Sequence, residues 1–264
     1  MQNIPVEVGQ MLFTMVDPNR GHEVDFNRWY ERDHRLSGCM VGPGWFAGGR
    51  WVATRELKNL RFPATGPVAV PVDAGSYLAV YWVHKPEMES AEAWAKAQVG
   101  WLYAQGRGFT EREHVHTGLY LPDANVSAHD DGVPLELALD HNYRGLVVVT
   151  IEPSDGVARQ TVIDKLTEGP VRALLDTGAV DLVSMWGMKP WPPDHNPPMK
   201  MGNDGGTTDR IVQLCFLEGD PADSWQHIVT YADEVDRSGA GRVTFAAPFI
   251  PTEVGTDKYT DQLW

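Results

Sequence analysis

The chain is poor in cysteine and in basic residues, and it has no long apolar run. Only Cys39 and Cys215 are present among 264 residues, too few for a disulfide framework, so we expect two small buried hydrophobic residues in a reducing cytoplasm. Lysine and arginine total 22 against 36 aspartate and glutamate residues. The resulting net charge of −14 argues against nucleic acid and against anionic membrane surfaces as partners.

Targeting segments and short catalytic motifs are missing as well. No apolar stretch approaches the roughly 20 residues of a membrane span, and the first ten residues lack the basic region of a signal peptide. The sequence contains no glycine-rich phosphate loop, no G-x-S-x-G elbow and no C-x-x-C pair. NAD, ATP and acyl-serine chemistry are therefore disfavoured.

What is present is a strongly patterned stretch over residues 26–51, FNRWYERDHRLSGCMVGPGWFAGGRW. From Phe26 onward, aromatic and ionisable side chains recur at helical spacing, and this stripe ends in Asp33 and His34. Gly38 and the Gly-Pro-Gly sequence after it predict that the helix ends near residue 36. The stretch thus predicts a helix with a charge pair at its C-terminal end.

Hydrophobic patterning predicts two sets of four strands and two helices, each in β-α-β-β-α-β order. The first set comprises strands 10–16, 45–53, 76–84 and 114–121 with helices 23–36 and 90–105. The second set comprises strands 145–151, 179–186, 210–217 and 242–250 with helices 158–175 and 222–235. Each set has one long Pro-rich loop, at 54–75 and 187–209.

The two sets align as an internal repeat with an offset of 135 residues, which brings Trp51 onto Trp186. Strand four of each set is predicted to stop at a proline, Pro122 or Pro251. The sequence therefore predicts an α+β fold of two tandem ferredoxin-like repeats, packed sheet to sheet as an intrachain α/β barrel with a cavity between the sheets. The expected domains are 1–125 and 145–252, with a linker at 126–144 and a C-terminal tail at 253–264.

The pattern F-x2-W-Y-x3-H, followed nine residues later by Pro-Gly, resembles the EthD-like branch of the dimeric α/β-barrel superfamily. That superfamily includes muconolactone isomerases, small polyketide monooxygenases and cyclases, and haem proteins such as chlorite dismutase. The second half departs from the pattern, since Asp164, Lys165 and Gly169 stand where Trp29, Tyr30 and His34 would be. A site built on this motif is therefore expected once.

His34 is the leading catalytic candidate. A helix C-terminus and the neighbouring Asp33 would both raise its pKa, which suits a general acid or base near neutral pH, with Tyr30 and Asp33 orienting or tuning it. The resemblance adds that a histidine at this position acts in proton transfer in lactone-isomerising members. The alternative is a helix-end cap that bonds its own carbonyls.

Strand four offers a second group of candidates. By alternation His114, His116 and Tyr120 share one face, which is expected to line the cavity and bind substrate. The H-x-H spacing also suits a metal, but no third ligand is evident, so none is expected. A solvated edge-strand face is the alternative.

Other residues complete the predicted site. Arg50 is expected to hold the oxyanion that develops on the substrate, and the alternative is that it forms a surface ion pair. Tyr81 and Trp29 are expected to line the substrate cavity. Trp45 and Trp51 are expected in the core, and His195 is interpreted as a residue of a loop over the barrel mouth.

These observations lead to a functional hypothesis. We expect a cofactor-independent lyase or isomerase that moves a proton on a small, mostly apolar, oxygenated molecule, such as a lactone, a polyketide or an aromatic-catabolic intermediate. A haem- or metal-dependent oxidoreductase of the same superfamily is the first alternative, and a non-catalytic binder of small ligands is the second. The expected partner is a small-molecule substrate, and the sequence leaves a homodimer open.

Overall fold

The computed structural model describes residues 5–191, 196–202 and 208–264. The strands are β1 (Val8–Pro18), β2 (Trp45–Val52), β3 (Tyr77–His84), β4 (Arg112–Ser127), β5 (Gly145–Pro153), β6 (Leu182–Lys189), β7 (Ile211–Leu217) and β8 (Gly241–Pro251). The α-helices are α1 (Glu23–Trp29), α2 (Arg55–Lys58), α3 (Met88–Ala104), α4 (Arg159–Glu168), α5 (Pro170–Asp176) and α6 (Trp225–Arg237). Short 3₁₀ and π turns are η1 (Tyr30–His34), η2 (Leu36–Met40), η3 (Lys85–Glu87) and η4 (Leu135–Leu137).

The eight strands form a closed antiparallel barrel in the order β1-β3-β2-β8-β5-β7-β6-β4. The first four strands of the chain lie in the order β4-β1-β3-β2, and the last four lie in the order β8-β5-β7-β6. The two sets meet where Trp51 of β2 pairs with Pro251 and where Trp186 of β6 pairs with Pro122. The architecture is α+β, as predicted.

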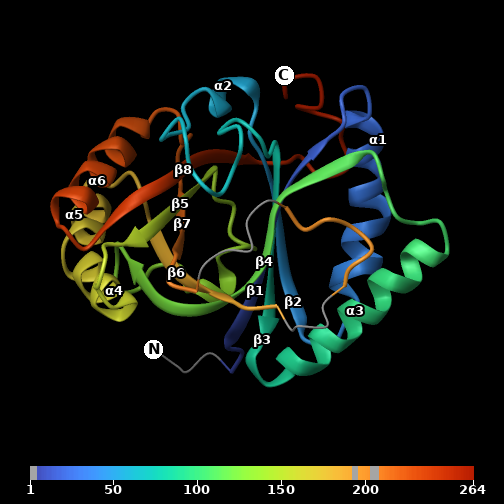
Figure 1. Cartoon of the computed structure of the whole chain (residues 1–264), viewed down its shortest axis with the longest axis horizontal. Coiled ribbons are helices and arrows are strands. Elements are labelled where there is room, and N and C mark those ends of the chain that lie inside the picture. The colour runs from blue at the N-terminus through green and yellow to red at the C-terminus, as the bar shows by residue number, and fades with distance from the viewer. Residues whose placement is uncertain (1–4, 192–195, 203–207) are drawn as a thin grey trace.

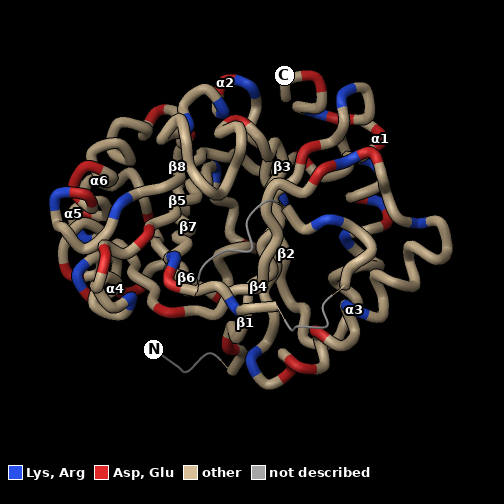
Figure 2. Tube along the Cα trace, viewed as in Figure 1, with Lys and Arg blue, Asp and Glu red and all other residues tan. Residues whose placement is uncertain are grey.

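Helices cover the barrel from outside on both sides. In Figure 1, α4, α5 and α6 lie against one part of the barrel, and α1 and α3 lie against the other. Lys, Arg, Asp and Glu gather on the outer helices and loops in Figure 2. Among the described residues, no helix is long and apolar enough to cross a membrane.

Large side chains fill the barrel interior, where the sequence predicts a cavity. Trp82 and Trp186 stack with ring centroids 5.0 Å apart, and both are fully buried. Phe13 and Tyr120 belong to the same buried cluster. The clefts described below therefore lie at the strand ends rather than between the sheets.

The first helix runs further than predicted. α1 continues without interruption through the wide turns η1 and η2 and ends at Met40, so Gly38 lies inside it. An added Cβ at Gly38 would lie 2.8 Å from Nδ1 of His34. Gly38 thus allows a close approach to the imidazole and does not end the helix.

Two further boundaries differ from the prediction. The helix expected over 158–175 divides at Gly169–Pro170 into α4 and α5, because proline has no N–H for the helix ladder. β4 does not stop at Pro122 but continues to Ser127. Its pairing with β6 is irregular between Pro122 and Ala124. An irregularity of this kind accommodates a proline within a strand.

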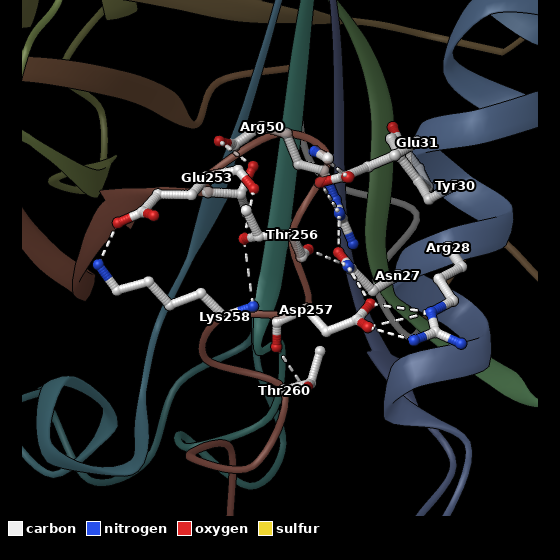
Figure 3. A network of polar contacts seen from close by, with 12 residues as sticks. Asn27, Arg28, Tyr30, Glu31, Arg50, Glu253, Thr256, Asp257, Lys258 and Thr260 are labelled. Atoms are coloured by element: carbon white, nitrogen blue, oxygen red, sulfur yellow. Dashed lines mark hydrogen bonds and ion pairs between the residues drawn. The ribbon is translucent and has the colours of Figure 1, made fainter.

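The segment after β8 packs against α1, and Figure 3 shows its Thr256 and Asp257 next to Asn27 and Arg28. The Asn27 side-chain amide donates to the carbonyl of Thr256 at 2.8 Å, and Arg28 forms an ion pair with Asp257. The N–H of Gly255 donates to Glu31 at 2.7 Å. Leu263 is fully buried in the aromatic cluster beneath α1, which makes this segment part of the core.

Candidate functional site

The beginning of β4 separates the two strand histidines. Met15 pairs with His116 and the next residue, Val16, pairs with His114, so the register shifts between them. His116 lies with Phe13 and Tyr120 in the barrel interior, whereas His114 bonds Thr14 and Thr117 on the opposite face of the sheet. The prediction that His114 and His116 share a face is therefore wrong, because simple alternation does not anticipate this bulge.

His116 and Tyr120 form a buried polar pair inside the barrel. Nε2 of His116 and the Tyr120 hydroxyl are 2.5 Å apart, and both rings meet the edge of Phe13. Both side chains are about 2% exposed. Their place is in the packed interior and not at the wall of an open cavity.

His114 lies beneath the helices. Its Nδ1 is 2.7 Å from Oγ1 of Thr117. Its Nε2 is buried and has no hydrogen-bond partner among the described residues. Burial lowers the pKa of His114 to about 3, and the nearby charges of Arg112 and His34 act in the same direction. The imidazole is therefore neutral at physiological pH.

His34 lies on η1 with its ring stacked on Trp29, at 4.5 Å between centroids, and edge-on to Tyr30. Burial lowers its pKa to about 3, and the positive charge of Arg112 adds to this effect. The sequence predicts the opposite shift. That prediction is wrong because burial outweighs the effect of Asp33, and because the helix continues to Met40, so that His34 is not at its carbonyl end.

Asp33 is held by residues other than His34. The Arg107 guanidinium donates to its carboxylate at 3.0 Å, and Ser37 donates at 2.6 Å. These contacts hold the pKa of Asp33 below its usual range. Asp33 opposes the fall in the pKa of His34 only weakly, and no hydrogen bond between their side chains is found in the described structure.

Tyr30 and Tyr81 join the helix to the sheet. Their hydroxyl oxygens are 2.7 Å apart, and both side chains are buried. Burial is the first cause that raises the pKa of each phenol, so both keep their protons at neutral pH. Of the two, Tyr30 meets the His34 ring edge-on.

Arg50 is engaged in the protein itself. Its guanidinium donates to Glu31 at 3.1 Å and to the side-chain oxygen of Asn27, and it lies over the rings of Tyr30 and Tyr77. Figure 3 shows it directed toward α1. The pair is buried, with the Arg50 and Glu31 side chains 2% and 6% exposed. Arg50 is thus neither a surface ion pair nor a cavity cation, because its charge is already compensated.

A cavity of about 410 Å³ opens at the start of β4, next to His114. Its wall comes from the end of α3, from the strand itself and from a segment of the second half: Tyr103, Phe109, Thr110, Arg112, Glu113, His114, Pro198, Met199, Lys200 and Gly202. A second cleft of about 330 Å³ shares Glu113 and His114 with it. These two clefts make His114 the best placed of the predicted substrate-binding residues.

Sequence reasoning missed Arg112. It lies two residues before His114, on the same face of β4, and its guanidinium is 4.5 Å from the Trp29 ring. The signal was alternation, which holds between these two positions, but the strand is predicted to begin only at His114. The remaining predictions concern the two cysteines, two tryptophans and His195. Both cysteines are buried, as are Trp45 and Trp51, whereas His195 lies outside the described residues.

Comparison with known proteins gives matches in structure only. No protein-family model and no curated protein sequence matches the chain. A protein assigned as a chlorite dismutase aligns with a TM-score of 0.53 and 10% identity, over 98% of this chain and 100% of that one. A variant chlorite dismutase from Candidatus Nitrospira defluvii gives a TM-score of 0.51 and 9% identity, over 97% and 96% of the two chains.

An anthrone oxidase-like protein aligns with a TM-score of 0.50 and 10% identity, over 95% of each chain. At these identities the matches show a similar fold only. The matched proteins are named as chlorite dismutase-like and anthrone oxidase-like. They do not single out the EthD-like branch of the superfamily, which the helix motif resembles.

Proposed function

We propose that the chain is an oxidoreductase of the dimeric α/β-barrel superfamily whose site is the cavity lined by His114, with His34 on the neighbouring helix. The observation that carries the site is the neutral imidazole of His114 in the wall of a cavity that Tyr103 and Phe109 also line, with neutral His34 near enough to lower the pKa of His114. The names of the similar structures support oxidation, the alternative from the sequence, over the lyase or isomerase.

A haem, which the chlorite dismutase names imply, does not fit the described residues. In the second half, the layer between the sheet and α4, α5 and α6 is filled by a tightly buried, mostly aliphatic cluster that contains no histidine among the described residues. In the first half, aromatic rings and the Arg50–Glu31 pair fill that layer. The described residues also contain no group of three His, Cys, Asp or Glu side chains suited to a metal.

The reaction that these residues suit starts with a proton. A methylene group between aromatic rings or carbonyls is acidic, and Arg112 in the cavity wall stabilises its anion. Neutral His34, a weak base because burial lowers its pKa to about 3, accepts one of the methylene protons. Dioxygen then adds to the carbanion, the imidazolium returns its proton to the peroxide, and water leaves. The balance is R₂CH₂ + O₂ → R₂C=O + H₂O, so no external reductant is needed. The aromatic wall excludes water from the anion.

We also propose that the chain consists of two tandem repeats. The strand order is the same in both sets of four, and Trp51–Pro251 and Trp186–Pro122 are matching pairs across the two junctions. These features support two ferredoxin-like repeats, divided as 1–125, 126–144, 145–252 and 253–264. Only the first repeat carries a histidine at the position of His34. A homodimer and a cytoplasmic location stay predictions.

The proposed function is tested with anthrone as substrate in an oxygen electrode. We expect consumption of one O₂ per ketone formed, because the balance above requires it. His34→Gln should reduce kcat by about 10²- to 10⁴-fold, the usual contribution of one general acid–base group. His227→Gln, a change at an exposed histidine of α6, is the matched control and should keep full activity.

Other outcomes identify other classes. Conversion of substrate without oxygen consumption would replace the oxidoreductase by the lyase or isomerase, since both begin with the same proton transfer. Retention of a small molecule without any turnover would mark a binder. Activity of folded His34→Gln within a few-fold of the unaltered protein would remove His34 from the mechanism.

A further inference from the structure

Two buried nitrogen atoms in the wall of the β4 cavity lack partners. Nε of Arg112 and Nε2 of His114 have no hydrogen-bond partner among the described residues, although both belong to residues that line the cavity. The two residues pair with Pro18 and Val16 of β1 in regular alternation, so their side chains share one face of the sheet. Other buried polar atoms of the described structure also lack partners, but these two belong to residues that share one face and line the same cavity, which indicates a ligand that pairs with them.

The charge of Arg112 is likewise uncompensated by protein. Its guanidinium reaches the Tyr103 hydroxyl at 3.3 Å and lies over the Trp29 ring. In the described part of the chain it forms no ion pair with a carboxylate, whereas Arg50 and Arg107 each have one. A largely enclosed guanidinium without a counter-ion is costly, and it suits a planar oxyanion.

We propose that the cavity binds a planar aromatic molecule through an anionic oxygen, carboxylate or enolate, held by Arg112 and His114. The inference rests on the proposed function for the place of the site and names the substrate class. Phe109 and Tyr103 supply ring faces from the cavity wall, and about 410 Å³ is within the range of small-molecule sites. Arg112 and Lys200 together outweigh the carboxylate of Glu113 at the wall, which leaves the wall with a net positive charge, in a chain of net charge −14, and favours the approach of anions.

The test is equilibrium binding, which requires no turnover. Isothermal titration at pH 7 compares 2-naphthoate with its neutral isostere 2-naphthamide and with cyclohexanecarboxylate, an anion without an aromatic ring. We expect 2-naphthoate to bind at least about tenfold more tightly than either, since a charge-assisted hydrogen bond distinguishes ligands by about that factor or more. Raising the salt concentration should weaken 2-naphthoate binding more than 2-naphthamide binding.

The variants separate the guanidinium from general charge effects. In Arg112→Gln the preference for 2-naphthoate over 2-naphthamide should fall to within about threefold, while 2-naphthamide binding stays unchanged. Arg112→Lys keeps the charge but loses the planar fork, and an intermediate preference is expected. Arg144→Gln removes one exposed positive charge elsewhere and should retain the full preference.

The unaltered protein decides the question even if the Arg112 variants do not fold. Equal affinity for 2-naphthoate and 2-naphthamide would overturn the inference, and so would an unchanged preference in folded Arg112→Gln. Preference for the anion without oxidation of anthrone would overturn the proposed function and leave the binding inference standing. Oxidation of anthrone without a preference for the anion would do the reverse.

Discussion

At the scale of single residues, Gly38 controls the position of His34. Its Cα faces the imidazole so closely that an added Cβ would lie 2.8 Å from Nδ1 and 3.5 Å from a methyl of Leu102. Gly38→Ala should therefore displace the His34 ring and reduce kcat by about tenfold or more, since small misplacements of a catalytic group are costly. Measurement of kcat together with the thermal midpoint checks this expectation.

Gly100→Ala is the matched control for this change. Gly100 is an exposed glycine of α3 with no atom within 4 Å of an added Cβ. It should raise stability by about 0.5–1 kcal/mol, because alanine is the better helix former, and leave kcat unchanged. Equal kcat in both variants would show that the position of the His34 ring does not matter for turnover.

The helical stripe made part of the site predictable. Periodicity alone placed Phe26, Tyr30 and His34 toward the sheet, where the structure has them. The state of His34 was not predictable, because its pKa depends on burial and on Arg112, which is 78 residues further along the chain. The partner of Arg50 was not predictable either. It is Glu31, and periodicity places Glu31 on the helix but does not indicate which side chain it contacts.

At the scale of elements, strand positions followed from the sequence better than strand faces. All eight strands lie where alternation and apolar runs predict them, within a few residues except at the C-terminal end of β4. The prediction of which face a side chain occupies fails at a bulge, because one extra residue reverses the alternation. The sequence around this bulge has no feature that indicates it. The prediction that His114 and His116 share one face is wrong for this reason.

The C-terminal segment is another element whose role depends on tertiary contacts. Leu263 is fully buried against the cluster of Phe26 and Tyr30, whereas Asp257 meets Arg28 near the surface. Leu263→Ala should lower the free energy of unfolding by about 2–5 kcal/mol, the usual cost of such a cavity. Asp257→Asn should change it far less, because exposed ion pairs contribute little. Urea denaturation of both variants compares the two effects, and a larger loss in Asp257→Asn would contradict this account.

At the scale of the whole molecule, the two neutral histidines make stability depend on pH. The pKa of His34 and of His114 is about 3 in the folded chain, against about 6.5 in an unfolded one. The unfolded chain therefore binds more protons between these values, and stability falls as pH decreases from about 6.5 toward 3. Each histidine contributes at most about 1.4 kcal/mol per pH unit.

Urea denaturation at pH 7.5, 6.5 and 5.5 measures this dependence. The unaltered protein should be slightly less stable at pH 6.5 than at pH 7.5, because the unfolded histidines are half protonated at pH 6.5, and clearly less stable at pH 5.5. A double variant, His34→Gln with His114→Gln, should lose less stability on the same step, since glutamine does not titrate. An identical loss in both proteins would assign the acid sensitivity to other groups.

The closed barrel also governs how this chain meets other chains during synthesis. Because β2 pairs with β8 at Trp51 and Val52, and β4 pairs with β6 from Leu119 to Ser127, every described strand has a strand neighbour on both edges. An incomplete chain that ends before Gly241 leaves one edge of β2 and one edge of β5 open. Open edges recruit strands from neighbouring molecules, so a ribosome-bound or truncated chain is prone to aggregate until β8 closes the barrel.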